Sequence, residues 1–242
     1  MIVCLDSGNT RIKWGLHDGQ AWLAQGAVAH ADVAELATLP ASWPSPEAIV
    51  LANVAGPQVL TRIRVALGVW ASSIVEVTPC KNSHGIANLY DRPERLGVDR
   101  WCALIGARRI SASPCVVVMA GTATTIDTLD ADGNFLGGLI LPGSELMRRS
   151  LARDTAGLPL AEGNYTAYPR CTEDAIVSGA IEAQQGAIER AYRRLPDGAG
   201  CCILSGGNAA QLAAGLVIPF LQADNLPLEG LKEIALEMRE SA

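Results

Sequence analysis

The apolar positions of the chain form two successive series that follow the same order. Each series has an apolar run, a short turn containing Gly and Thr, and a second run, with residues 2–5 and 11–16 around the first turn and 115–120 and 124–129 around the second. Short apolar runs that end at turn residues are typical of β-strands. Because the two turns are about half a chain apart, the pattern predicts a duplicated fold with two similar lobes.

The rest of the pattern alternates between short apolar runs and amphipathic segments, which is typical of α/β domains. Further strands are predicted at residues 22–28, 48–52, 74–77, 134–141 and 201–204. Helices are predicted at residues 31–38, 57–68, 144–152, 172–194 and 228–239, and another begins near Pro93. Loops are predicted around Pro40 and over residues 80–91 and 153–171. Residues 1–110 are therefore assigned to an N-terminal lobe and residues 111–242 to a C-terminal lobe.

The predicted helix after Pro93 has a regular apolar face. The residues at helical spacing on this buried face are Val98, Trp101, Cys102, Ile105 and Arg109. Asp99 lies off this face, so its carboxylate can point into a cleft. The spacing alone favours a different interpretation, in which Asp99 is a solvated helix residue or pairs with a neighbouring Arg.

Composition and charge exclude several classes of protein. The net charge is −6 and the pI is near 5.1, which argues against a nucleic-acid surface. No apolar run reaches the length of about 18 residues that spans a membrane, and the N-terminus lacks the charged and apolar regions of a signal peptide. The seven cysteines are odd in number and form no Cys-x-x-Cys motif. These features predict reduced cysteines in a cytoplasmic protein that binds neither nucleic acid nor membrane.

The first turn contains the side chains that a phosphate site needs. Gly8 lets the backbone turn sharply and approach a ligand. Asp6 stands at the mouth of the turn, where a carboxylate can hold a hydrated divalent cation, and Lys13 adds positive charge. An ordinary hairpin with a polar turn would look similar, but the recurrence of a similar turn at residues 121–125 favours a phosphate cradle. The chain has neither a Walker-type nor a Gly-x-Gly-x-x-Gly motif.

Four motifs together resemble those of the type III pantothenate kinase family. In chain order they are Asp6-Ser7-Gly8-Asn9-Thr10-Arg11-Ile12-Lys13, Gly97-Val98-Asp99-Arg100-Trp101, Gly121-Thr122-Ala123-Thr124-Thr125 and Ser205-Gly206-Gly207-Asn208. Each motif alone is weak, but the four in order cover nearly the whole chain. The resemblance implies the fold of the actin-like ATPase and sugar kinase superfamily, with two ribonuclease-H-like lobes and a nucleotide cleft between them.

The resemblance also implies the activity, which is ATP-dependent phosphorylation of pantothenate to 4′-phosphopantothenate at the start of coenzyme A biosynthesis. Asp99 would be the general base and Asp6 the Mg²⁺ ligand. ATP contacts are implied at Asp6, Ser7, Gly8, Asn9, Thr10, Arg11, Ile12, Lys13, Thr122, Gly206 and Gly207. Pantothenate contacts are implied at Tyr90, Gly97, Val98, Asp99, Arg100 and Thr172. A homodimer is implied as well.

Some of these residues also have purely structural explanations. Gly206 and Gly207 suit a plain strand-to-helix turn, and Arg100 could be a surface charge on its helix. Thr172 could serve only as the N-cap of the long helix that follows.

One position departs from the family pattern. The family usually has an Asp two residues before the glycine of the second turn, where it helps bind an activating K⁺ or NH₄⁺, and this chain has Met119. A thioether is a poor ligand for a hard cation. Either the monovalent cation is not needed, or backbone carbonyls and another acid replace the ligand, or activity is weakened. We predict weak K⁺ dependence.

Two other functions fit the same sequence. The chain could be a weakly active or inactive relative that acts as a transcription accessory factor, or a kinase of the same superfamily with a sugar or small acid as acceptor. Retention of Asp6, Lys13, Asp99 and Arg100 favours an enzyme. The Gly-Val-Asp-Arg sequence at residues 97–100 favours pantothenate as the acceptor.

Overall fold

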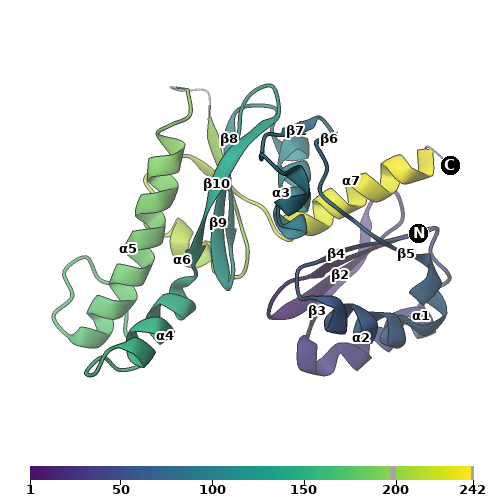
Figure 1. Ribbon diagram of the computed structural model, residues 1–242. Coiled ribbons are helices and arrows are strands. Elements are labelled where there is room, and N and C mark those ends of the chain that lie inside the picture. The colour runs from purple at the N-terminus through teal and green to yellow at the C-terminus, as the bar shows by residue number, and fades with distance from the viewer. Residues whose placement is uncertain (197–199, 241–242) are drawn as a thin grey trace. The chain divides into compact units, whose positions relative to one another are not determined.

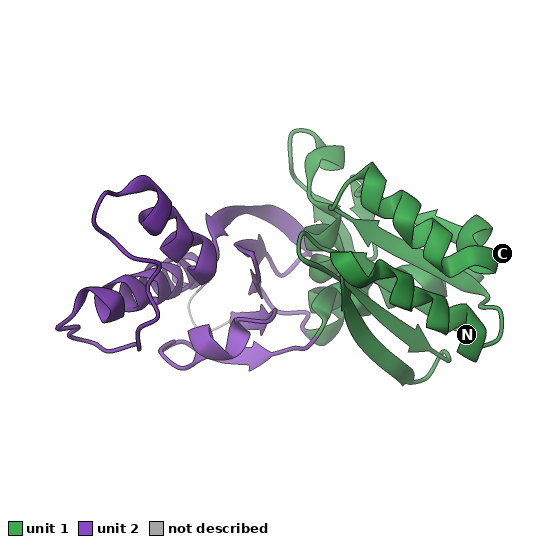
Figure 2. Cartoon of the chain, turned by 90° about the horizontal axis from the view of Figure 1, so that it is seen from below, with its two compact units in different colours: residues 1–110, 225–242 green, residues 111–224 purple. Residues whose placement is uncertain are grey.

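A computed structural model describes residues 1–196 and 200–240 of the chain. It divides the chain into two compact units, which Figure 2 shows in green and purple. Unit 1 comprises Met1–Ile110 together with the C-terminal segment that begins at Asn225, and unit 2 comprises Ser111–Asp224. No helix among the described residues is long and apolar enough to cross a membrane.

Unit 1 is built on a mixed sheet in which strands of both directions meet at β1. The strands are β1 (Ile2–Ser7), β2 (Arg11–His17), β3 (Trp22–Ala29), β4 (Ala48–Asn53) and β5 (Ile74–Glu76), in the order β3-β2-β1-β4-β5. The first three strands are antiparallel, and β4 and β5 run parallel to β1. Because side chains alternate along a strand, Val3 and Leu5 pack into one core layer, and Ile2 and Cys4 pack into another.

Helices cover the two faces of this sheet. The helices of unit 1 are α1 (Thr38–Ser42), α2 (Pro57–Leu67), α3 (Val98–Ile110) and α7 (Leu226–Glu240), with 3₁₀ turns at His30–Ala37, Gly68–Ser73 and Pro93–Arg95. The Ile2 and Cys4 face packs against α3 and α7, which lie side by side (Figure 1). Two very short strands, β6 (Asn82–Ser83) and β7 (Ile86–Asn88), pair as a hairpin.

Unit 2 repeats the sheet topology of unit 1. Its strands are β8 (Cys115–Ala120), β9 (Ala123–Leu129), β10 (Asn134–Pro142), β11 (Cys201–Ser205) and β12 (Phe220–Gln222). They are neighbours in the order β12-β11-β8-β9-β10, with β8, β9 and β10 antiparallel and β11 and β12 parallel to β8. The strands β1 to β5 therefore correspond one by one to β8 to β12. This repeat confirms the predicted α/β fold with two similar lobes.

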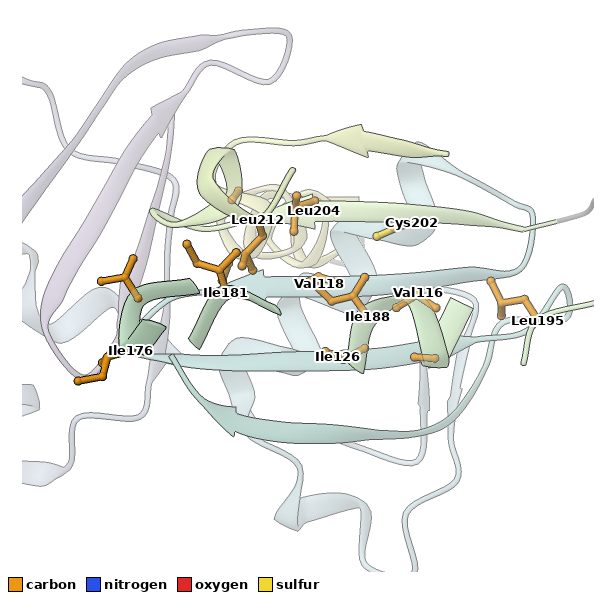
Figure 3. Packing of buried hydrophobic residues seen from close by; sticks show 14 of the residues in the cluster. Val116, Val118, Ile126, Ile176, Ile181, Ile188, Leu195, Cys202, Leu204 and Leu212 are labelled. Carbon is orange, nitrogen blue, oxygen red and sulfur yellow. The ribbon is translucent and has the colours of Figure 1, made fainter. Parts of the chain in front are cut away.

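A long helix forms much of the core of unit 2. The helices of this unit are α4 (Ser144–Asp154), α5 (Thr172–Tyr192) and α6 (Ala209–Ala213). Figure 3 shows Ile181 and Ile188 of α5 beside Val116 and Val118 of β8. Because the core consists mainly of Ala, Val, Leu and Ile side chains, it forms without the aromatic residues that the chain largely lacks.

The C-terminal helix differs from its predicted place. Residues 225–242 were assigned to the C-terminal lobe, whereas the structure places residues 225–240 in unit 1. The reason is that Leu228, Leu231 and Ala235 are fully buried in the core layer of Ile2 and Cys4. Position in the sequence alone does not reveal which sheet a terminal helix covers.

Several local predictions need correction. Pro40 lies in the first turn of α1 rather than in a loop, because that turn needs no N–H from it. The helix that carries Asp99 begins at Val98, and Pro93 begins a separate 3₁₀ turn. Arg109 is exposed and pairs with Glu233 at 3.0 Å, so it does not belong to the buried face of its helix. The predicted loop 80–91 contains the hairpin of β6 and β7, and β12 was not predicted.

Candidate active site

The turn between β1 and β2 carries a buried carboxylate. Asp6 lies on the same face of β1 as Ile2 and Cys4, and its register partner on β2 is Lys13. The Asp6 side chain is buried, and its Oδ1 atom has no hydrogen-bond partner. An oxygen buried without a partner is costly, so this carboxylate is arranged for a group that binds from outside the protein.

Hydrogen bonds hold the backbone of this turn in place. The Gly8 N–H donates to the Arg11 carbonyl at 3.1 Å, which closes the turn. His30 Nε2 lies 2.7 Å from the Gly8 carbonyl. Since a carbonyl only accepts, Nε2 carries the hydrogen and donates it. Asn9, Thr10 and Arg11 are exposed at the turn.

Two residues of the first motif point away from the turn. Ser7 and Ile12 are register partners, and both are fully buried. Ile12 belongs to the core layer of Val3 and Leu5, so only its backbone is available to a ligand. The motif therefore alternates between core residues and residues that face the site.

The negative charge of Asp99 acts on the buried carboxylate of Asp6. The pKa of Asp6 is raised to about 7, because burial and then the negative charge of Asp99 raise it more than the charge of Lys13 lowers it. Two nearby carboxylates disfavour each other's ionised form. A divalent cation would remove this repulsion and provide the missing partner of Oδ1.

The geometry of this site fits a hydrated magnesium ion. Among the described residues, no group of three or more His, Cys, Asp or Glu side chains could hold a metal ion. Magnesium keeps several waters and is typically bound by one or two carboxylates together with substrate phosphates. A site with Asp6 as the protein ligand therefore suits Mg²⁺ that arrives with a nucleotide.

Asp99 lies in the first turn of α3. Its Oδ1 accepts the backbone N–H of Arg100 at 2.9 Å, and the side chain is half-buried. Burial raises the pKa of Asp99, and the Arg100 N–H and the Arg100 charge oppose the shift. The structure therefore brings the predicted base and the predicted metal ligand into one electrostatic cluster.

Arg100 is a buried residue and not a surface charge. It is 5% exposed, and its Nη1 donates to the Tyr90 hydroxyl at 3.0 Å. Asn88 fixes the Tyr90 loop, because its Oδ1 accepts the Tyr90 N–H and its Nδ2 donates to the Pro93 carbonyl, both at 3.1 Å. A guanidinium held in this way is a ready partner for a carboxylate.

The corresponding turn of unit 2 carries no charge. The Gly121 N–H donates to the Ala123 carbonyl at 3.0 Å. The Thr122 carbonyl accepts the Gly143 N–H at 2.9 Å. A Cβ at Gly143 would lie only 2.3 Å from the Gly121 carbonyl oxygen, so glycine is required for this close packing.

The motif at residues 205–208 anchors the same turn. Asn208 donates its backbone N–H to the Ala120 carbonyl at 3.0 Å and its Nδ2 to the Gly121 carbonyl at 3.3 Å. Gly206 has φ +102°, and a Cβ there would lie 2.3 Å from the Ala120 oxygen. Gly206 is therefore explained by packing within unit 2. Gly207 faces open space, where a ligand has room.

Thr172 lies apart from these turns. It is the first residue of α5, and Cys171 is the N-cap residue, so the N-cap explanation of Thr172 is wrong. Thr172 lines a cavity of about 520 Å³ between α4 and α5. The structure of unit 2 does not bring it to the turn at Gly121.

Within unit 1 the structure thus groups Asp6, Lys13, Asp99 and Arg100 with the Tyr90 loop. Sequence reasoning missed the roles of His30, Asn88 and Gly143 as supports, and it gave Asn208 no role of its own. Asn208 belonged to a recognised motif, and Asn88 lay in the predicted Tyr90 loop, so these two could have been suspected. Nothing in the sequence signals the contact of His30 with the Gly8 carbonyl.

Comparisons with known proteins show the family and the fold of the chain. The family model described as type III pantothenate kinase matches residues 2–194. A type III pantothenate kinase of Dechloromonas aromatica is 65% identical over 98% of this chain and 100% of that protein. A Campylobacter jejuni protein, provisionally described as a Baf family transcriptional activator, has a similar structure, with TM-score 0.67 and 21% identity over 98% of this chain and 99% of that one. An activator of 2-hydroxyisocaproyl-CoA dehydratase from Clostridium difficile, with bound ADPNP, has TM-score 0.53 and 12% identity over 100% of this chain and 97% of that one. The two structures show the fold, and the family model with the first relative shows that the chain belongs to the type III pantothenate kinase family.

Proposed function

We propose that this kinase transfers the γ-phosphoryl group of ATP to the 4′-hydroxyl of pantothenate, giving 4′-phosphopantothenate and ADP for coenzyme A biosynthesis. The observation that carries the proposal is the pair of carboxylates formed by the buried Asp6 and the half-buried Asp99, with Lys13 beside Asp6. One carboxylate suits the metal and the other suits the acceptor hydroxyl. This arrangement gives the family assignment a chemical basis in this chain.

The turn after β1 would bind the phosphates. Phosphoryl transfer depends on positioning and on neutralising charge more than on covalent chemistry by the protein. The groups available to position the phosphates and neutralise their charge are Lys13, the exposed side chains of Asn9 and Thr10, and the backbone from Ser7 to Ile12. Mg²⁺ held by Asp6 would neutralise charge on the phosphate oxygens.

Asp99 would act as the general base. The hydroxyl oxygen forms a bond to the γ-phosphorus while the bond between that phosphorus and the β,γ-bridging oxygen breaks, and the hydroxyl proton passes to the Asp99 carboxylate. A hydroxyl loses its proton late in such a reaction, so a modest base suffices. The raised pKa of Asp99 makes it a better acceptor for this proton than an exposed carboxylate.

The acceptor would be recognised through its own carboxylate. Arg100 with Tyr90 supplies a buried cation and a hydroxyl for this anion, beside Gly97 and Val98. Thr172 is the remaining predicted contact. A sugar acceptor has no carboxylate to match Arg100, and this mismatch supports pantothenate over a sugar.

Unit 2 would provide further nucleotide contacts. We assign phosphate contacts to Gly121 and Thr122, and adenosine contacts to the open side of Gly207, with Gly206 serving the fold of that turn. Because Met119 is half-buried and offers only a thioether, we propose activity without a K⁺ or NH₄⁺ cofactor. A homodimer and a cytoplasmic location remain predictions.

The experiment is ADP release by the wild-type protein with MgATP, with and without pantothenate, followed by mass analysis of the phosphorylated product. A sugar and a hydroxy acid serve as control acceptors. Turnover that requires pantothenate supports the proposal. Turnover only with another acceptor would point to a different kinase, and a folded protein with no turnover would point to the regulatory alternative.

A further inference from the structure

Gly97 is the residue just before α3. The space beside its Cα is filled by the carboxylate of Asp99. A Cβ at this position would lie 2.6 Å from Asp99 Oδ1, whereas the next nearest atoms, Arg100 Cδ and Asp99 Cγ, are 3.7 and 3.8 Å away. Gly97 does not have the positive φ that favours glycine elsewhere in the chain. The Asp99 carboxylate is therefore the one close neighbour that a side chain at residue 97 would meet.

The Asp99 carboxylate is held between two parts of the backbone. Its Oδ1 accepts the Arg100 N–H at 2.9 Å and lies against the bare Cα of Gly97. With Oδ1 held in this way, the remaining oxygen, Oδ2, is the one that can turn toward an acceptor hydroxyl. The rotamer of Asp99 thus depends on the absence of a side chain at residue 97.

We infer that Gly97 is a positioning residue that fixes the carboxylate of Asp99, in addition to any part it has in lining the substrate pocket. The inference rests on the proposed function, since it takes Asp99 as the general base. It goes further because it gives Gly97 an indirect role in the reaction. Gly97 leaves room for Oδ1 of Asp99, so that Oδ2 is the oxygen that accepts the proton.

The test begins with Gly97→Ala. The obstructing atom is the end of a side chain, so the carboxylate can rotate away without a shift of the backbone. A displacement of about 1 Å at a reacting group costs roughly 100-fold in rate. We expect kcat to fall by about 30- to 100-fold, with the KM for pantothenate nearly unchanged. Gly186→Ala, at an exposed position of α5 with open space around it, is the matched control and should leave kcat unchanged.

A stability cycle tests the contact without using turnover. Gly97→Ala is made in the wild-type protein and in Asp99→Ala, and the four melting temperatures are compared. In Asp99→Ala the obstructing oxygen is gone, so Gly97→Ala should lower the melting temperature only when Asp99 is present. An equal fall in melting temperature in the wild-type protein and in Asp99→Ala would overturn the inference and would indicate a backbone role for Gly97.

The kinetic result separates the remaining explanations. A raised KM for pantothenate with unchanged kcat would show that Gly97 only lines the substrate pocket, and it would overturn the positioning role. Absence of turnover in the wild type would refute the proposed function, while the stability cycle would still decide whether residue 97 acts through Asp99.

Discussion

The turns that follow β1 and β8 differ in length but share two corresponding backbone hydrogen bonds. In each turn the glycine N–H donates to a carbonyl at the start of the next strand, from Gly8 to Arg11 and from Gly121 to Ala123. The residue before each glycine also accepts an N–H from the loop after the neighbouring parallel strand, with Val54 donating to Ser7 and Asn208 to Ala120, both at 3.0 Å. The two units therefore share the hydrogen bonds that link each turn to the neighbouring strands.

The side chains at the turns after β1 and β8 differ in charge. Two residues before the glycine, unit 1 has Asp6 and unit 2 has Met119, and across the ladder their partners are Lys13 and Thr125. Charged groups in unit 1 suit metal binding and proton transfer. The turn of unit 2 instead has carbonyls held by amide donors, which suits the positioning of a nucleotide.

The largest effect is expected from Asp6→Asn, which removes the carboxylate that unit 1 has at the position of Met119 in unit 2. An amide is a much weaker magnesium ligand than a carboxylate, and the metal contributes several kcal/mol of charge stabilisation. We expect kcat/KM to fall by about 10³-fold, measured as pantothenate-dependent ADP release over a magnesium titration. A loss of less than tenfold would contradict the metal role of Asp6.

The same substitution should stabilise the unliganded protein at high pH. The pKa of Asp6 is about 7 in the folded state against an ordinary value of 3.8, so the folded state binds this proton more tightly than the unfolded state does. The stability that this provides is full below about pH 4 and is lost as the pH rises through about 7. Asp6→Asn avoids this loss, and we expect it to be more stable by about 2–4 kcal/mol at pH 8 and little different at pH 4.

The measurement is denaturant unfolding of both proteins without nucleotide or magnesium, at pH 4, 6 and 8. A difference that does not change with pH would contradict the burial of an ionised Asp6. Added magnesium and ATP should narrow the difference at pH 8, because the wild type alone gains a ligand for its carboxylate.

A smaller effect is expected from Asn208→Ala in unit 2. This change removes the donor to the Gly121 carbonyl and leaves the backbone N–H of residue 208 in place. One net hydrogen bond is worth about 1 kcal/mol, so we expect the KM for ATP to rise roughly three- to tenfold with little change in the KM for pantothenate. Asn164→Ala, at an exposed position of the same unit, is the control. A rise in the KM for pantothenate alone would contradict the role of this turn.

The smallest effect is expected from potassium. The Ala120, Gly121 and Thr122 carbonyls each already accept a hydrogen bond within unit 2, so they are not obvious replacements for a lost carboxylate ligand at Met119. We expect ATP turnover to change less than about twofold between sodium and potassium buffers. A steep rise of ATP turnover with potassium would show that another group binds the potassium ion in place of residue 119. Met119→Asp would then show whether a carboxylate at residue 119 restores tighter potassium binding.

Much of the fold could be predicted because local patterns determine it. The apolar runs of β1 and β8 and the alternation in β2 mark strands whatever their surroundings. The motif at residues 97–100 could likewise be assigned to a helix, although that helix begins at Val98 and not near Pro93. These features depend on neighbours within a few residues, which a single sequence displays.

The rest depends on contacts between distant parts of the chain. The packing of α7 on unit 1 is decided by the fit of Leu228 and Leu231 against the layer of Ile2 and Cys4. Arg109 fits the helical period of the buried face but lies near the exposed end of α3, where Glu233 of α7 provides an ion pair. The contact of His30 with Gly8 joins residues 22 positions apart, and no local pattern marks it.

We propose that the charged site of unit 1 performs the reaction, with Asp99 as the base. The most direct measurement is pantothenate-dependent ADP release by the wild type and by Asp99→Asn, together with ATP binding by calorimetry. The account predicts a loss of turnover of at least about 100-fold in Asp99→Asn, with ATP affinity nearly unchanged. Turnover in Asp99→Asn close to that of the wild type would contradict it.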